Sequence, residues 1–288
     1  MQSSLFFSDV ETPRQEVQLE LLHSSESGFS QIYRVDKEGK FRVLKCLRPQ
    51  FRGNPAFETL LRKEFEIDYP LDHPNICSVI AMVRMEELGN CIEMEWVDGC
   101  TLTELLGRRE LSKALENNIL LELCSAMEYI HSKQIIHRDI KPDNILVTHN
   151  GGNVKLIDFG LSDTDYHTAH KESAGTQIYA SPEQVRGEAL DARSDIYSLG
   201  RVIFELSDRF NRIALKCMSR EPDKRYGTVG QVRQALEKRM RSRLGAIIAT
   251  AALLGAVAFG AYVFSAKADS AAGVFKAVTQ EIIDAQEE

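Results

Sequence analysis

A long run without any charged side chain, residues 244–266, limits what this chain can fold into more than any other feature of its sequence. As a helix, the run would be about 35 Å long at roughly 1.5 Å per residue, enough to cross a bilayer core of about 30 Å. A buried helix of a globular domain is the alternative, but such helices are seldom apolar on every face over this length. We therefore predict a single membrane-spanning helix at 244–266.

The charges that flank this run predict its orientation. Basic residues gather on its N-terminal side: Lys238, Arg239, Arg241 and Arg243. Only Lys267 and Lys276 follow it. Because positive charge is enriched on the cytoplasmic side of spans, we expect the preceding residues to be cytoplasmic and residues 267–288 to form a short tail outside.

Within the run, Ala252, Ala256 and Gly260 recur every four residues. This spacing of small side chains permits close pairing of two such helices as a homodimer, although it also arises by chance in alanine-rich sequences.

The composition of the remaining chain is that of a globular protein, with 43% hydrophobic and 27% charged residues overall. The formal net charge of −7 gives no sign of nucleic-acid binding. The six cysteines include no C-x-x-C pair, so a reduced environment is the simplest interpretation.

The pattern along the chain changes from strands to helices. Residues 15–110 alternate between apolar and polar side chains in several short runs, interrupted by one stretch of helical spacing at 54–69. Helical spacing then dominates, notably at 117–133 and 194–207. A strand-rich half followed by a helix-rich half predicts an α+β fold of two lobes with a cleft between them.

Three motifs follow one another in the helical half: IIHRDIKPDNILV at 135–147, VKLIDFGLS at 154–162 and GTQIYASPEQV at 175–185. With them the sequence resembles the eukaryotic-type protein kinases, in particular their serine/threonine branch, over about residues 20–238. The resemblance implies a bilobal kinase fold.

The expected domains are an N-terminal extension (1–14), an N-lobe (15–97) and a C-lobe (98–240) of one kinase domain (15–240), the span and the tail. The arrangement is similar to that of single-span receptor-like kinases of the bacterial inner or plasma membrane, although most of those have larger outer domains.

The resemblance implies roles for four residues in phosphoryl transfer. Asp139 would accept or orient the proton of the substrate hydroxyl, and Lys141 would stabilise the transferred phosphoryl group. Asn144 and Asp158 would hold Mg²⁺, or Mn²⁺ in its place, through oxygen ligands.

The resemblance also implies an ATP site in the strand-rich half. Val43 and Lys45 are two residues apart and share one face of a strand. Lys45 would reach the α- and β-phosphates with Glu64 as its ion-pair partner, and Val43 would contact the adenine. Met94 would border the back of the pocket, and backbone groups of Glu95 and Val97 would bind the adenine edge. The loop that normally covers the phosphates departs from the family pattern, with Ser25, Ser27 and Ser30 at the glycine positions, Ile32 at the valine position and Gly28 out of register.

Other residues match structural or regulatory positions of the family. Glu183 would pair with Arg225, and Asp195 would support the catalytic loop. Arg138 is typical of kinases that are switched by phosphorylation of the activation loop, for which the candidate acceptors are Thr164, Thr168 and Ser173.

A deletion is the second departure from the family. After residue 207 the chain continues almost at once into DRFNRIALKCMSREPDKRY, so the helix usually called G is missing or vestigial.

We predict a membrane-anchored serine/threonine kinase that phosphorylates proteins and itself. A nucleotide-binding pseudokinase scaffold is the alternative, since the phosphate loop and helix G are altered. A small-molecule kinase is a third, which the peptide-binding segment SPEQV disfavours.

Overall fold

The computed structural model describes residues 18–24, 28–108, 111–158, 178–241 and 254. The chain divides into two compact units, Met1–Gln234 and Ala235–Glu288. In the part that the structure describes, no helix is long and apolar enough to span a bilayer. The predicted span at 244–266 lies outside that part, apart from one residue, and stays a prediction.

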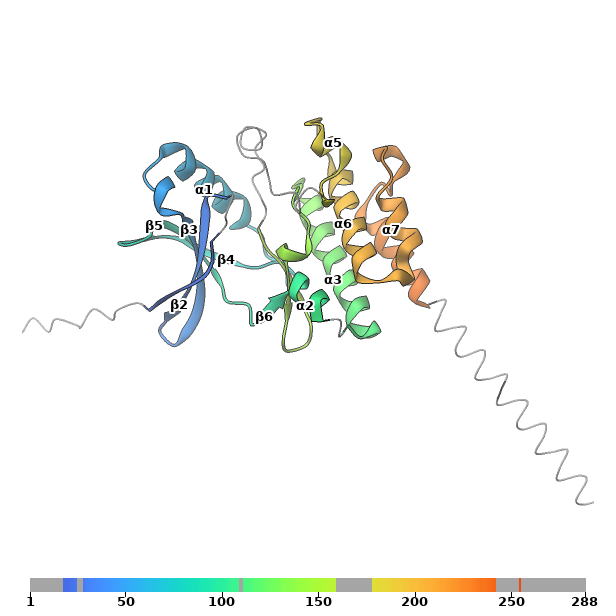
Figure 1. The fold of residues 1–288 in the computed structure, drawn as a ribbon, viewed down its shortest axis with the longest axis horizontal. Coiled ribbons are helices and arrows are strands. Elements are labelled where there is room, and N and C mark those ends of the chain that lie inside the picture. The colour runs from blue at the N-terminus through green and yellow to red at the C-terminus, as the bar shows by residue number, and fades with distance from the viewer. Residues whose placement is uncertain (1–17, 25–27, 109–110, 159–177, 242–253, 255–288) are drawn as a thin grey trace, which may run out of the picture. The chain divides into compact units, whose positions relative to one another are not determined.

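A five-stranded antiparallel sheet of order β1-β2-β3-β5-β4 forms the N-lobe (Figure 1). Its strands are β1 (Leu19–Ser24), β2 (Ser30–Lys37), β3 (Lys40–Leu47), β4 (Val79–Met85) and β5 (Gly89–Glu95). Side chains alternate between the two faces of a strand. Leu44 and Cys46 of β3 accordingly enter one buried cluster, and Leu47 enters the cluster on the opposite face. Lys45 therefore lies on the face of Leu47.

Helix α1 (Pro55–Asp68) covers the face of the sheet that carries Lys45. Asn54 caps the N-terminus of the helix, and its side chain accepts a hydrogen bond of 3.0 Å from the backbone N–H of Ala56. Leu61, Glu64 and Asp68 recur at intervals of three and four residues and are the buried side chains of the helix. Burial of Leu61 against β3 thus brings Glu64 onto the sheet face of Lys45.

The C-lobe is built mainly of helices, with a three-stranded sheet of order β6-β7-β8 at its N-terminal side. Its helices are α2 (Leu102–Arg108), α3 (Lys113–Ser132), α5 (Pro182–Val185), α6 (Ala192–Leu206) and α7 (Asn211–Cys217), and residues 229–241 are also helical. Its strands are β6 (Gly99–Thr101), β7 (Ile145–Thr148) and β8 (Val154–Leu156). Helix α6 contacts both α3 and α7 (Figure 1). Two short 3₁₀ turns are η2 (Pro142–Asn144), which lies within the motif at 135–147, and η5 (Pro222–Lys224), which follows α7.

Backbone hydrogen bonds connect strand β8 to the segment between α1 and β4. The Leu156 N–H donates to the Asn75 carbonyl at 2.9 Å, and the Cys77 N–H donates to the Leu156 carbonyl at 2.9 Å. Asp158 lies two residues beyond Leu156, so this connection places its carboxylate near the N-lobe.

Helices α6 and α7 are separated by residues 207–210 alone, which contain the 3₁₀ turn η4 (Asp208–Phe210). This stretch, described throughout, holds no further α-helix, which agrees with the prediction that helix G is missing or vestigial. Gly200 of α6 makes the close approach of the two helices feasible. A Cβ atom there would lie 2.5 Å from Cys217 Cβ and 3.0 Å from the Ala214 carbonyl oxygen.

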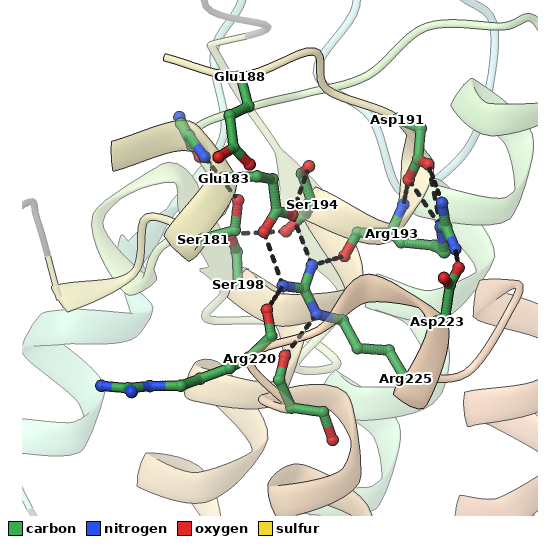
Figure 2. Close-up of polar contacts among 12 residues, drawn as sticks. Ser181, Glu183, Glu188, Asp191, Arg193, Ser194, Ser198, Arg220, Asp223 and Arg225 are labelled. Atoms are coloured by element: carbon green, nitrogen blue, oxygen red, sulfur yellow. Dashed lines mark hydrogen bonds and ion pairs between the residues drawn. The ribbon is translucent and has the colours of Figure 1, made fainter. Parts of the chain in front are cut away.

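The predicted pairing of Glu183 with Arg225 is confirmed, and both side chains are buried (Figure 2). Arg225 Nη1 lies 2.6 Å from Glu183 Oε1 and Nη2 lies 2.7 Å from Oε2. Ser194 Oγ also donates to Glu183 Oε1 at 2.8 Å. Since Glu183 belongs to α5, Ser194 to α6 and Arg225 follows η5, these bonds join three elements of the C-lobe.

Candidate active site

Lys45 pairs with two carboxylates that come from different parts of the chain. Its Nζ lies 2.5 Å from Glu64 Oε1 and 2.6 Å from Asp158 Oδ1. Burial lowers the pKa of Lys45, but the carboxylates of Asp158 and Glu64 outweigh it and raise this pKa. The predicted Lys45–Glu64 pair is therefore present, and the two carboxylates hold Lys45 as a cation.

Burial raises the pKa values of Glu64 and Asp158, and the charge of Lys45 lowers them, but the net shift differs between the two acids. Burial outweighs the attraction of Lys45 and raises the pKa of Glu64. At Asp158 burial acts in the same sense, but the charge and hydrogen bond of Lys45 prevail and lower the pKa. Asp158 is therefore the carboxylate that stays ionised most readily.

The carboxylate of Asp139 is held from two sides. Lys141 Nζ lies 2.7 Å from its Oδ2, and Asn144 Nδ2 donates to the same oxygen at 2.8 Å. Asn144 Nδ2 also lies 2.8 Å from the Asp139 carbonyl oxygen. The predicted catalytic residues Asp139 and Lys141 thus lie together with the Asn144 side-chain amide, because the turn η2 folds Asn144 back toward Asp139.

A buried carboxylate supports this loop from beneath, as the sequence predicted for Asp195. Its Oδ2 accepts a hydrogen bond from the His137 N–H and its Oδ1 accepts one from the Arg138 N–H, both at 2.8 Å. Oδ2 also lies 2.8 Å from His131 Nε2. The first turn of α6 therefore fixes the backbone immediately before Asp139.

His137 was not predicted to have a role, yet its side chain connects the loop of Asp139 with the segment that leads to Asp158. The Asp139 N–H lies 3.3 Å from His137 Nδ1, and His137 Nε2 lies 3.2 Å from the carbonyl oxygen of Ile157. Burial lowers the pKa of His137 against the opposing attraction of Asp195. A neutral ring with its proton on Nε2 satisfies both contacts.

Two residues of the site have positive φ angles, Arg138 at 68° and Asp158 at 55°. Such angles are unfavourable for residues with a Cβ and persist where neighbouring contacts fix the backbone. At Arg138 the fixing contacts are the bond to Asp195 and a bond of 2.7 Å from Gln184 Nε2 to its carbonyl oxygen. The sequence motifs did not predict this role of Gln184.

Asn144 and Asp158 fit the ligand set that a magnesium ion requires. The Ile157 N–H donates to the Asn144 carbonyl at 3.0 Å, which brings the residue before Asp158 beside Asn144. Asn144 uses its amide nitrogen for Asp139, which leaves the orientation of its side-chain oxygen defined. A carboxylate and an amide oxygen beside phosphate oxygens suit Mg²⁺, which keeps several waters in such sites.

Of the residues predicted to surround the adenine, Val43, Met94 and Glu95 lie on paired strands, and Val97 follows β5. Val43 of β3 is directly opposite Met94 of β5, and Met94 borders the buried cluster beneath α1. The Glu95 N–H donates to the Ser78 carbonyl at 3.0 Å, so this N–H is engaged within the protein. Val97 is buried. The structure brings these residues together at the end of β5 that leads into the C-lobe.

Only part of the predicted phosphate loop is described. Ser25 and Ser27 lie outside the described residues, as do the candidate acceptors Thr164, Thr168 and Ser173. Arg48 Nη1 donates to the Gly28 carbonyl at 3.1 Å, Ser30 begins β2 opposite Leu47, and Ile32 lies opposite Lys45.

The sequence matches the protein kinase domain family over residues 26–211, and the chain therefore belongs to this family. Its curated relatives place it among the eukaryotic-type serine/threonine kinases of the bacterial kind.

One relative is a probable serine/threonine-protein kinase of Streptomyces coelicolor, 32% identical over 82% of this chain and 41% of its own length. Another, the serine/threonine-protein kinase PknB of Mycolicibacterium smegmatis, is 32% identical over 67% of this chain and 38% of its length. The serine/threonine-protein kinase PrkC of Bacillus subtilis is 40% identical over 57% of this chain and 26% of its length. The chain thus spans about two fifths, or less, of these relatives.

Among solved structures, the kinase domain of Mycobacterium tuberculosis PknI has a similar fold. The TM-score is 0.61 at 22% identity, over 77% of this chain and 96% of the PknI domain. This likeness concerns the fold, and it agrees with the bilobal architecture predicted from the motifs.

Proposed function

We propose that this protein transfers the γ-phosphoryl group of ATP to serine or threonine hydroxyls of proteins. The observation that carries the proposal is the Asp139 carboxylate, held at Oδ2 by Lys141 and Asn144, in a loop that His137 connects to the segment of Asp158. Phosphoryl transfer depends mainly on positioning and on neutralising charge, and these residues supply both.

Each residue has a chemical task in this proposal. Lys45 binds the α- and β-phosphates of ATP. Asp139 accepts the proton of the substrate hydroxyl. At the same time the hydroxyl oxygen forms a bond to the γ-phosphorus of ATP, and ADP leaves. Lys141 stabilises the transferred group. Asn144 and Asp158 hold Mg²⁺, which when bound neutralises the charge of the phosphates.

The test is phosphate transfer by the full chain in lipid nanodiscs, with labelled ATP and Mg²⁺ and a generic protein substrate. We expect label on serine and threonine, reduced at least a hundredfold by Asp139→Asn. The matched control is Asp72→Asn, because Asp72 is an exposed aspartate outside the site. Transfer that Asp139→Asn leaves unchanged, or ATP binding without any transfer, would contradict the proposal; the latter outcome is the one a pseudokinase scaffold predicts.

We further propose that the kinase phosphorylates its own activation loop. Mass spectrometry of the same reactions should find phosphate on Thr164, Thr168 or Ser173. Absence of phosphate from all three, in protein that labels the substrate, would reject this part alone.

Membrane anchoring through residues 244–266 is supported by the absence of charge in that run and by the basic residues before it. We propose a cytoplasmic kinase domain with residues 267–288 outside, and homodimer contacts along Ala252, Ala256 and Gly260. Alkaline extraction and labelling of a cysteine introduced at Ser270 from the outer side would test the topology. Loss of self-association in Gly260→Ile would test the pairing.

A further inference from the structure

Cys46 and Cys91 occupy directly opposite positions on β3 and β5. Both are free thiols, and they belong to the same buried cluster on the sheet face away from α1. Directly opposite Cα atoms of an antiparallel pair are about 4.5–5.5 Å apart, and disulfides span about 4.4–6.8 Å between Cα atoms. The strand register therefore brings these cysteines within reach of a disulfide bond.

The surroundings of the pair favour a reactive sulfur at Cys46. Cys91 Sγ donates to the Gly89 carbonyl at 3.5 Å. The neighbouring Cys91 thiol lowers the pKa of Cys46, and the Cys46 thiol raises the pKa of Cys91. The guanidinium of Arg52 acts on Cys46 in the same direction, against the effect of burial. Arg52 is itself fixed there, since its Nε donates to the Leu47 carbonyl at 2.9 Å and its Nη1 to the Glu87 carbonyl at 2.8 Å.

The side chains packed against the cluster that holds the pair are only partly buried. Both cysteines are fully buried, but several side chains around their cluster are themselves partly exposed: Leu19, Tyr33, Val83 and Met85. Small local openings among these side chains are less costly than global unfolding. A small oxidant can therefore reach the sulfurs from this face without disturbing the face that carries Lys45.

We propose that Cys46 and Cys91 are a redox-sensitive pair that a hydroperoxide converts into a disulfide. The Cys46 thiolate attacks the O–O bond and becomes a sulfenic acid, while the hydroperoxide leaves as an alcohol, or as water from H₂O₂. The sulfur of Cys91 then displaces the hydroxyl group as water and forms the S–S bond. Two thiols are oxidised by two electrons, one peroxide is reduced, and a dithiol reductant reverses the change.

The disulfide would alter the ATP site, a consequence that rests on the proposed function. Opposite Cβ atoms in a sheet are about 4.5–5.5 Å apart, whereas a disulfide requires about 3.8 Å. The bond therefore draws β3 and β5 together by about 1 Å next to Lys45, which precedes Cys46. Displacements of about 1 Å can cost up to a hundredfold in rate. We expect oxidation to weaken ATP binding by about tenfold.

The experiment treats the full chain in nanodiscs with stoichiometric H₂O₂, blocks the remaining thiols and maps disulfides by tandem mass spectrometry. We expect a Cys46–Cys91 disulfide that dithiothreitol removes, and a sulfenic acid trapped on Cys46 by dimedone in Cys91→Ser. Cys124 is also fully buried and serves as the internal control, which should stay reduced. Equal oxidation of Cys124, or no Cys46–Cys91 linkage in wild-type protein, would overturn the proposal.

A second readout separates this inference from the proposed function. Binding of a fluorescent ATP analogue is measured for reduced, oxidised and re-reduced protein. A disulfide that forms without a change in nucleotide affinity would overturn the predicted effect on the site. Reduced protein that does not bind nucleotide would instead contradict the proposed function, while the mass spectrum still decides whether the cysteine pair is oxidised.

Discussion

Asp68 lies one helical turn beyond Glu64 on α1, and both carboxyl groups are buried. Among the residues that the structure describes, Asp68 Oδ1 has no hydrogen-bond partner. Burial raises the pKa of Asp68 well above its ordinary value, and the neighbouring charges of Glu64 and Asp158 add to this effect while Lys45 opposes it. The helix thus carries one buried acid that pairs with Lys45 and a second whose burial favours its protonated form.

Asp68 should make the folded protein less stable as the pH rises. A carboxyl group whose pKa is higher in the folded state binds its proton more tightly there, so its contribution is present below its unfolded pKa of about 3.9 and is lost as the pH rises through the folded pKa. In Asp68→Asn this loss is removed, and the free energy of unfolding should depend less on pH above about 4. Urea unfolding at several pH values measures this.

Asp72→Asn is the control for that series, because Asp72 is exposed just beyond the helix. Its pH dependence should match that of the wild type. If Asp68→Asn also followed the wild-type curve, the carboxyl of Asp68 would not be protonated in the folded protein, and the assignment would be wrong.

The Glu183–Arg225 pair predicts a loss of stability at low pH. Burial opposes ionisation of Glu183, but the hydrogen bonds from Arg225 prevail and lower its pKa to about 2. The stabilisation is present above the unfolded pKa of about 4.3 and is lost as the pH falls toward 2. Glu183→Gln should cost about 3–5 kcal/mol at pH 7, because it leaves a buried guanidinium without its counter-charge.

The exposed pair of Arg186 and Glu188 is the matched control, with a nitrogen–oxygen distance of 2.6 Å. Both of its side chains are 52% exposed, so Glu188→Gln should leave the unfolding midpoint unchanged. Equal effects of the two substitutions would show that burial does not determine the strength of the Glu183–Arg225 pair.

Gly200→Ala should destabilise the C-lobe by about 1–3 kcal/mol, because the added methyl group meets the Cys217 side chain and the backbone of α7. Gly107 is the matched control in α2, where an added Cβ meets nothing within 4 Å. Gly107→Ala should be neutral or stabilising by up to about 1 kcal/mol. Thermal unfolding of both variants checks the prediction, and a larger loss in Gly107→Ala would contradict it.

The motifs predicted much of this site because each catalytic residue stands at a fixed distance from its neighbours in the chain. Two-residue spacing placed Val43 and Lys45 on one strand face, and the bond from Asn144 to Asp139 follows from a single turn. Long-range placement is different. The partners of His137 and the burial of Asp68 depend on how distant segments meet, and no local pattern encodes that. Nor does spacing show that Cys46 lies opposite Cys91, which requires the strand register.

The last prediction concerns Asp195, which acts through the backbone of the catalytic loop rather than on the substrate. Asp195→Asn keeps the size of the side chain but replaces one of its two acceptor oxygens with a donor. It therefore cannot accept from both the His137 and Arg138 N–H groups, each of which lies 2.8 Å from a carboxylate oxygen. The loop then loses its fixed position relative to Lys45, although Lys45 keeps its own partners.

For the proposed kinase activity we expect kcat to fall by about ten- to a hundredfold in Asp195→Asn, while the affinity for ATP changes less than about threefold, because a small displacement of a catalytic group affects the reaction more than ground-state binding. Steady-state kinetics and a separate nucleotide-binding titration distinguish the two quantities. A proportional loss of ATP affinity would show instead that Asp195 supports the whole domain, and an unchanged kcat would show that the loop keeps its position without this carboxylate.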